Sequence, residues 1–211
     1  MTMSLEPDRV ERLRKKLYEK AKREPDFRFY TLYDKVCWTE TLERAYRKAK
    51  ANAGAAGVDG VRFENIEAYG VERWLSELRQ ELVEEMYRPQ PVRRVMIPKP
   101  GGGERPLGIP TIRDRVVQTA VVFLLLEPIF EADFEDNAYA YRPERSAHDA
   151  LAEVRKRLYE GQQHVVDADV AQYFDTIPPR RVAAKRGAAG GRREDPAPAQ
   201  AVAEVAGRGE G

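Results

Sequence analysis

Apolar side chains recur every three or four residues in three stretches of the first ninety residues. This spacing places them on one face of a helix. We therefore expect amphipathic helices over residues 8–24, 38–52 and 71–86, each burying its apolar stripe in a shared core. The inward positions are Val10, Leu13, Leu17 and Ala21 in the first helix, Leu42, Ala45, Tyr46 and Ala49 in the second, and Trp74, Leu78, Leu82 and Met86 in the third.

From residue 87 the pattern changes from helical spacing to short extended segments separated by proline and glycine. The prolines exclude a helix between residues 89 and 110, because each one removes a backbone N–H donor. A strand over 92–97, a glycine-rich turn over 100–105 and a returning strand over 107–109 together predict a β-hairpin.

Two further helices are expected after the hairpin. Residues 112–127 form an apolar run that we expect to be a buried core helix ending at Pro128. Ser146, with Asp149 three residues later, has the spacing of a capping box, which predicts a helix start. That helix would place Leu151, Val154 and Leu158 on one face. His148, near its start, is expected to be a capping or surface residue and not a metal ligand, because no second His or Cys lies at the spacing of a metal site.

Composition narrows the class of protein. The 211 residues carry a net charge of only +1, which argues against a wholly basic coat but leaves local basic patches open. The single cysteine, Cys37, has no partner for an internal disulfide and suits a reducing compartment, so we expect a cytoplasmic protein. Residues 1–24 are too charged for a signal peptide, and the apolar run 116–126 is too short to span a membrane.

The sharpest candidate for chemistry is the stretch 164–175, HVVDADVAQYFD. Alternation predicts a strand with Asp167 and Asp169 on one face and Val166, Ala168 and Val170 on the other. Ionised carboxylates on an apolar strand cost free energy unless a cation compensates, and paired carboxylate oxygens are ligands that Mg²⁺ takes. The alternative is a strand end whose aspartates point at water.

Cations are concentrated in three other places. Lys99 and Arg105 flank the predicted hairpin tip, where a point charge and a planar fork could hold a triphosphate, or could be ordinary basic surface. The basic first fifty residues are either a solvated face or a surface that contacts phosphate. Arg142 and Arg145 lie beside Tyr139 and Tyr141 and could meet a nucleic-acid backbone or a stacked base, unless these tyrosines simply pack.

Four blocks of the sequence, taken in order, resemble those of group II intron-encoded reverse transcriptases, the reverse transcriptase/maturase family. The resemblance covers about residues 5–178 and implies an α+β fold, namely the fingers and part of the palm of a right-hand polymerase behind N-terminal helices. It implies RNA-templated addition of deoxynucleotides to a primer by two Mg²⁺ ions. The blocks are GVDGV, YRPQPVRRVMIPKPGGGERPLGIPTIRDRVVQ, YAYRPERSAHDAL and VVDADVAQYFDTIP.

Site residues follow from the resemblance by motif. Asp169 matches the first catalytic, metal-binding aspartate, while Lys99 and Arg105 match the finger residues that grip the dNTP triphosphate. Phe174 matches the aromatic residue beneath the sugar, which favours deoxynucleotides. Asp175 is expected to fix a turn, and Asp167 receives no firm role. The implied partners are dNTP, RNA template, DNA primer and group II intron RNA, with residues 54–60, the basic N-terminus, Arg142 and Arg145 on the nucleic-acid side.

The chain also departs from the family pattern. The YADD-type motif that supplies two further aspartates is absent, and residues 179–211 are mostly Ala, Gly, Pro and Arg, a composition that predicts disorder. We therefore expect three regions: 1–53 as a basic helical extension, 54–178 as fingers and partial palm, and 179–211 as a disordered or frameshifted tail, or else a genuine linker. The expected protein is an N-terminal reverse transcriptase fragment, inactive alone. The alternatives are an RNA-binding fragment without catalysis and a remnant without function.

Overall fold

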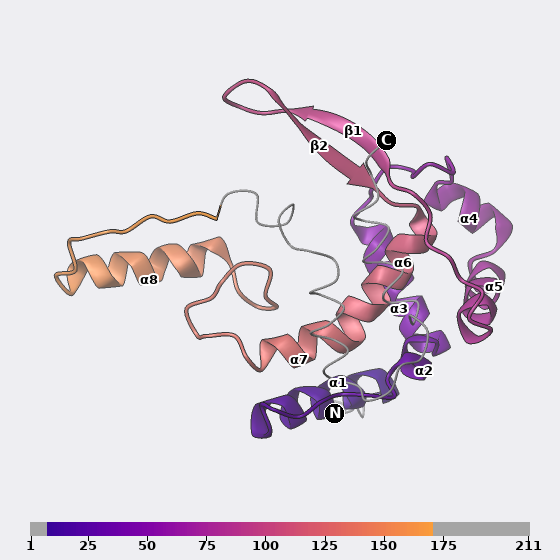
Figure 1. Cartoon of the computed structure of the whole chain (residues 1–211), viewed down its shortest axis with the longest axis horizontal. Coiled ribbons are helices and arrows are strands. Elements are labelled where there is room, and N and C mark those ends of the chain that lie inside the picture. Colours follow the sequence, from indigo (N-terminus) through magenta and orange to yellow (C-terminus); the bar gives the residue numbers. More distant parts are fainter. Residues whose placement is uncertain (1–7, 171–211) are drawn as a thin grey trace, which may run out of the picture.

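Helices dominate the structure, a computed structural model that describes residues 8–170 (Figure 1). Residues 8–90 form five helices: α1 (Arg9–Arg23), α2 (Tyr33–Val36), α3 (Thr39–Ala51), α4 (Phe63–Tyr69) and α5 (Val71–Val83). Helix α1 begins at Asp8, whose carboxylate accepts hydrogen bonds from the backbone N–H groups of Val10 and Glu11. The three amphipathic helices expected from the sequence are therefore confirmed, and α2 and α4 are additional short helices.

The apolar stripes meet in one core. Helix α3 packs along α6 (Ile112–Val121) and also contacts α5, while α1 packs against α7 (Glu127–Glu131). Leu42, Leu78 and Val116 are completely buried where these helices meet. Met86, expected on the inward face, is instead 59% exposed, because α5 ends at Val83 and the helical spacing no longer applies three residues later.

The predicted hairpin is confirmed as a two-stranded antiparallel sheet, β1 (Arg93–Pro98) and β2 (Glu104–Ile109). Its register pairs Ile97 with Arg105 and Pro98 with Glu104. Gly102 and Gly103 turn the chain at the tip with positive φ, a conformation that favours glycine. Figure 1 shows the hairpin projecting away from the helical body.

The apolar helix after the hairpin does not end at Pro128, as the sequence suggested. It continues from α6 through a π-helical turn, η1 (Val122–Leu126), into α7, with Pro128 in the first turn of α7. In the π register the N–H of Glu127 bonds to the carbonyl of Val122. In the same register the N–H of residue 128 would bond to the carbonyl of Phe123. Residue 128 is a proline and has no N–H, so this bond is missing.

Arg14 of α1 replaces the missing donor. Its guanidinium donates to the Phe123 carbonyl oxygen and to Glu127 Oε1, the latter at 2.6 Å, and lies 4.0 Å from the centre of the Phe123 ring. A side chain 109 residues away thus satisfies a carbonyl that proline leaves without a helical partner. The proline is tolerated because α1 docks here.

Arg14→Met should therefore destabilise the fold. The carbonyl and Glu127 both lose a charged donor in a site where the Arg14 side chain is only 18% exposed, and such bonds contribute about 1.5–3 kcal/mol each. We expect a lower urea midpoint for unfolding. Lys15→Met on the same helix is the control, since the Lys15 side chain is 78% exposed and its ion pair is 3.9 Å long. Equal midpoints for the two variants would contradict this role of Arg14.

Helix α8 (Ala147–Tyr159) begins with the expected capping box, in which Ser146 and Asp149 bond to each other's backbone N–H groups. Its apolar residues are not inward, however. Leu151, Val154 and Leu158 are each more than half exposed, and α8 lies apart from the helical core (Figure 1). The face that the sequence pattern assigns to a core has no cover among the described residues.

The strand expected over 164–175 is not formed in its described part. Residues 162–170 are exposed and have no regular structure, because a strand needs a neighbour and the two described strands pair only with each other. Phe174, Asp175 and the predicted tail lie outside the described residues. The fold is α+β, with many helices and one small sheet, and none of the described helices is long and apolar enough to cross a membrane.

Candidate functional site

Lys99 and Arg105 lie on the same face of the hairpin near its tip. Arg105 pairs with Ile97, and Lys99 follows Ile97 by two residues, so alternation places all three side chains on one side. The Lys99 N–H donates to the Gly103 carbonyl at 3.0 Å, which extends the ladder one step beyond the strands. Ile97 and Val95 make this the less exposed face of β1.

Both cations are available for a ligand. Each is exposed, and neither forms an ion pair or hydrogen bond through its side chain within residues 8–170. A lysine ammonium is a compact point charge, whereas an arginine guanidinium offers a planar fork of donors. Two such groups on one face of a narrow hairpin suit an anion with several phosphate oxygens.

The base of the hairpin is fixed by a buried polar cluster of Tyr87, Thr111 and Asp114, which the backbone N–H of the exposed Gln90 also contacts. One oxygen of Asp114 accepts from the Tyr87 hydroxyl at 2.5 Å, and the other accepts from the Thr111 hydroxyl at 2.7 Å and the Gln90 N–H at 3.2 Å. Burial, with the bond to Asp114 adding to it, raises the pKa of Tyr87 well above its ordinary value. The sequence pattern did not predict this cluster, although Thr111 and Asp114 have capping-box spacing.

The glycine-rich loop of residues 54–60 packs directly against this base. A side-chain carbon on Gly57 would lie 2.6 Å from Thr111 Cα and 2.7 Å from Thr111 N. Arg115 of α6 donates to the Ala55 carbonyl, and burial lowers the pKa of its guanidinium. The loop backbone therefore closely approaches another part of the chain.

A cavity of about 600 Å³ opens between this loop and the hairpin base. Its wall combines the loop with cations from three parts of the chain, of which Arg93 belongs to β1. The lining includes Lys50, Gly54, Gly57, Arg62, Phe63, Glu64 and Arg93. Several cations along one wall suit the phosphates of a nucleic-acid strand.

Asp169 is not brought to the hairpin by any described interaction. It lies with Asp167 on the exposed irregular segment that follows α8, and in Figure 1 this segment is separate from the hairpin. Within residues 8–170 no three His, Cys, Asp or Glu side chains are grouped so that they could hold a metal ion. The described residues therefore do not fit the Mg²⁺ site that the resemblance implies, because its carboxylates are not gathered there.

Arg142 and Arg145, both predicted to contact nucleic acid, have different environments. The Arg142 side chain is 5% exposed, forms an ion pair with Glu131 at 2.7 Å, and donates to the carbonyls of Glu135 and Ala138. These bonds occupy its donors and favour a packing role. Arg145 is exposed, with one bond to the Asp136 carbonyl at 3.2 Å, and it retains donors for a phosphate.

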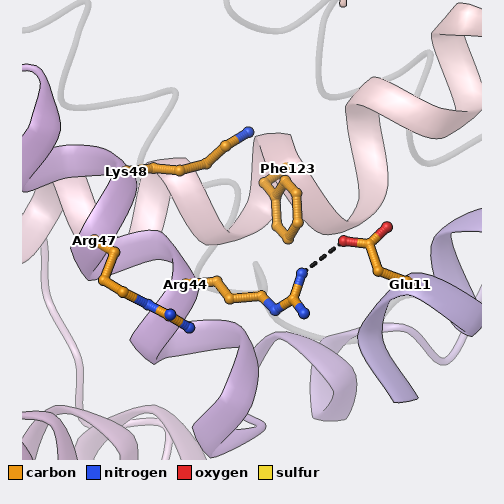
Figure 2. Close-up of a pocket in the computed structure, with 5 residues that line it drawn as sticks. All are labelled: Glu11, Arg44, Arg47, Lys48 and Phe123. Atoms are coloured by element: carbon orange, nitrogen blue, oxygen red, sulfur yellow. Dashed lines mark hydrogen bonds and ion pairs between the residues drawn. The ribbon is translucent and has the colours of Figure 1, made fainter. Parts of the chain in front are cut away.

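The basic N-terminal helices contain a second candidate surface, which Figure 2 shows between α1, α3 and η1. Arg44 points to Glu11 there, at 2.6 Å, and is neutralised by it and by Asp8. Lys48 lies 4.3 Å from the centre of the Phe123 ring, and Arg47 points away from this cluster. Arg44 is thus structural, whereas Arg47 forms no ion pair or hydrogen bond through its side chain within residues 8–170.

Known proteins are similar to this chain in sequence. The reverse transcriptase (RNA-dependent DNA polymerase) family model matches residues 97–193, which begin within β1 and include the hairpin tip, β2 and α6. Protein YkfC of Escherichia coli is 40% identical over 175 residues, which are 80% of this chain and 45% of YkfC. Residues 97–170 of the match lie in the described structure.

Two other relatives are named as intron proteins. The group II intron-encoded protein LtrA of Lactococcus lactis is 36% identical over 150 residues, 71% of this chain and 24% of LtrA. The putative COX1/OXI3 intron 1 protein of Saccharomyces cerevisiae is 31% identical over 138 residues, 65% of this chain and 16% of that protein. This chain thus spans less than half the length of each of these relatives. The family match, these relatives and the ordered sequence blocks agree, and the chain belongs to the group II intron-encoded reverse transcriptase and maturase family.

Proposed function

We propose that this chain provides the fingers and the first part of the palm of an RNA-directed DNA polymerase, and that its hairpin holds the triphosphate of the incoming dNTP. The observation that carries the proposal is the pair of exposed cations, Lys99 and Arg105, on one face of β1 and β2. Two positive groups at that spacing would position a triphosphate for transfer, and positioning is the main contribution of a protein to phosphoryl chemistry.

The nucleic-acid partners are proposed on the adjoining surface. RNA template and DNA primer would run past the cavity between the glycine-rich loop and the hairpin base, where Arg62 and Arg93 face it. Arg145 would add a phosphate contact. Asp169 would be the first carboxylate of the catalytic centre and Phe174 the residue under the sugar, and both roles are taken from their motif positions.

The chain alone should bind a dNTP but not extend a primer, because it lacks the YADD-type motif and a single matched aspartate does not hold two divalent ions. The test incubates the purified chain with a primer annealed to an RNA template, the four dNTPs and Mg²⁺, and follows primer length on a gel. Nucleotide binding is measured in parallel with a fluorescent dATP.

Two outcomes would each contradict one part of the proposal. Robust extension that Asp169→Ala abolishes would show that the chain is catalytically complete. Absence of dATP binding in a folded chain would remove the assigned role of the hairpin.

A second candidate function is binding of intron RNA without catalysis. The observation that favours it is the α1, α3 and η1 surface, where Lys48 lies beside Phe123 and Arg47 also lines the cavity (Figure 2). Arg47→Gln with Lys48→Gln should then weaken binding of intron RNA and reduce its dependence on salt, since fewer phosphate contacts release fewer counterions. Unchanged RNA affinity would reject this surface while leaving the nucleotide site intact.

A further inference from the structure

We propose that the buried carboxylate of Asp114 is a positioning residue, which fixes the angle at which the hairpin leaves the helical body. The hairpin projects from that body in Figure 1, and β1 and β2 pair only with each other among the described strands. Its direction therefore depends on how its two ends are attached. The consequence for nucleotide binding rests on the proposed function of the hairpin, whereas the attachment itself does not.

Asp114 is bonded to both ends of the hairpin. On the incoming side it accepts from the Tyr87 hydroxyl and from the N–H of Gln90, three residues before β1. On the outgoing side it accepts from the hydroxyl of Thr111, two residues after β2. Because Asp114 lies in the first turn of α6, a core helix, these three bonds join the hairpin to a rigid element.

The three side chains of the cluster are shielded from water. Tyr87, Thr111 and Asp114 are each 1% exposed. A buried carboxylate is costly unless its oxygens are well bonded, and here three donors converge on them. Packing alone does not explain a buried carboxylate at this position, because an apolar residue would fill the same space at a lower cost in free energy.

The position of Asp114 requires hydrogen-bond acceptors. A carboxylate offers lone pairs on both oxygens and so accepts from Tyr87, Thr111 and Gln90 at once. Leucine has the same branched arrangement of heavy atoms but no acceptor. In Asp114→Leu all three bonds are therefore lost, and with them the connection to both ends of the hairpin.

Tyr87→Phe is the milder variant, because it removes only the hydroxyl that reaches Asp114. Tyr33→Phe is its matched control: the Tyr33 hydroxyl donates to the Leu82 carbonyl at 2.7 Å, away from the hairpin ends. Both substitutions remove one tyrosine hydrogen bond and should lower stability by similar amounts. Only Tyr87→Phe and Asp114→Leu should affect the hairpin.

The test measures hairpin orientation with two spin labels. One label is placed at the tip through Gly101→Cys, where nothing lies within 4 Å of an added side-chain carbon, and the other on α1 through Lys15→Cys, with the buried Cys37 replaced by alanine. Double electron–electron resonance gives the distribution of distances between the labels. We expect a narrow distribution in the parent protein and in Tyr33→Phe, and broad ones in Tyr87→Phe and Asp114→Leu.

Narrow distributions in both Tyr87→Phe and Asp114→Leu would overturn the proposal, as would equal broadening in Tyr33→Phe. Tripolyphosphate binding is then measured on the unlabelled variants. If the binding orientation falls to about a tenth of the population, the dissociation constant should rise about tenfold. A parent protein that binds no tripolyphosphate would reject the function proposed for the hairpin and leave the spin-label result to decide the role of Asp114.

Discussion

Replacing both Lys99 and Arg105 with glutamine should weaken binding of dATP by about a hundredfold, since charge-assisted bonds contribute about 1.5–3 kcal/mol each and every 1.4 kcal/mol is a factor of ten. The expected loss of binding free energy for the double variant lies toward the low end of the combined range, because both side chains are exposed and water screens their charges. Titration of fluorescent dATP, followed by anisotropy, measures the change. Each single variant should lose about tenfold.

The control must remove the same two charges elsewhere. Arg12→Gln with Lys16→Gln does so, with one arginine and one lysine on the exposed side of α1. If the affinity depends on local geometry, this variant should bind dATP as the parent does. An equal loss in both double variants would show that only net charge attracts the nucleotide, and the assignment of the hairpin would fail.

Elements whose cause is local could be predicted from the sequence. The hairpin follows from prolines and glycines within about twenty residues, and the start of α8 follows from Ser146 and Asp149 alone. The amphipathic helices follow from spacing within each segment. The stripe of α5 failed at Met86, beyond the residue at which the helix ends.

Features that depend on distant residues were missed. The π-helical turn at η1 needs Arg14 of α1 to satisfy the Phe123 carbonyl, and no sequence pattern near Pro128 predicts that contact. The strand expected around Asp169 needs a neighbouring strand, which the described chain does not offer. Burial of α8 likewise needs a surface that packs against it.

The same distinction between local and distant causes applies to the residues of the candidate site. Lys99 and Arg105 were identified because hairpin geometry alone brings them together, and they remain the strongest pair. Asp114 was overlooked because its partners, Tyr87 and Gln90, are more than twenty residues away in the sequence. Arg142 was assigned to nucleic acid because the sequence does not reveal the acid and carbonyls that occupy it.

Gly57→Ala should be among the most destabilising single substitutions in the chain. The added carbon would meet Thr111 Cα at 2.6 Å, Thr111 N at 2.7 Å and the Pro110 carbonyl carbon at 3.0 Å. All three are backbone atoms, which cannot rotate away as a flexible side chain would. Overpacking of this kind costs about 1–3 kcal/mol and sometimes more, so we expect a clear fall in the midpoint of urea unfolding.

Gly101→Ala is the matched control, because nothing lies within 4 Å of its added carbon, and its midpoint should remain that of the parent. The clash at Gly57 also has a consequence beyond stability. Thr111 is the residue that it displaces, and Thr111 donates to Asp114 at the base of the hairpin. The variant should therefore weaken dATP binding even under conditions in which it is fully folded. If Gly57→Ala had both the stability and the dATP affinity of the parent, the packing of the glycine-rich loop on the hairpin base would be contradicted.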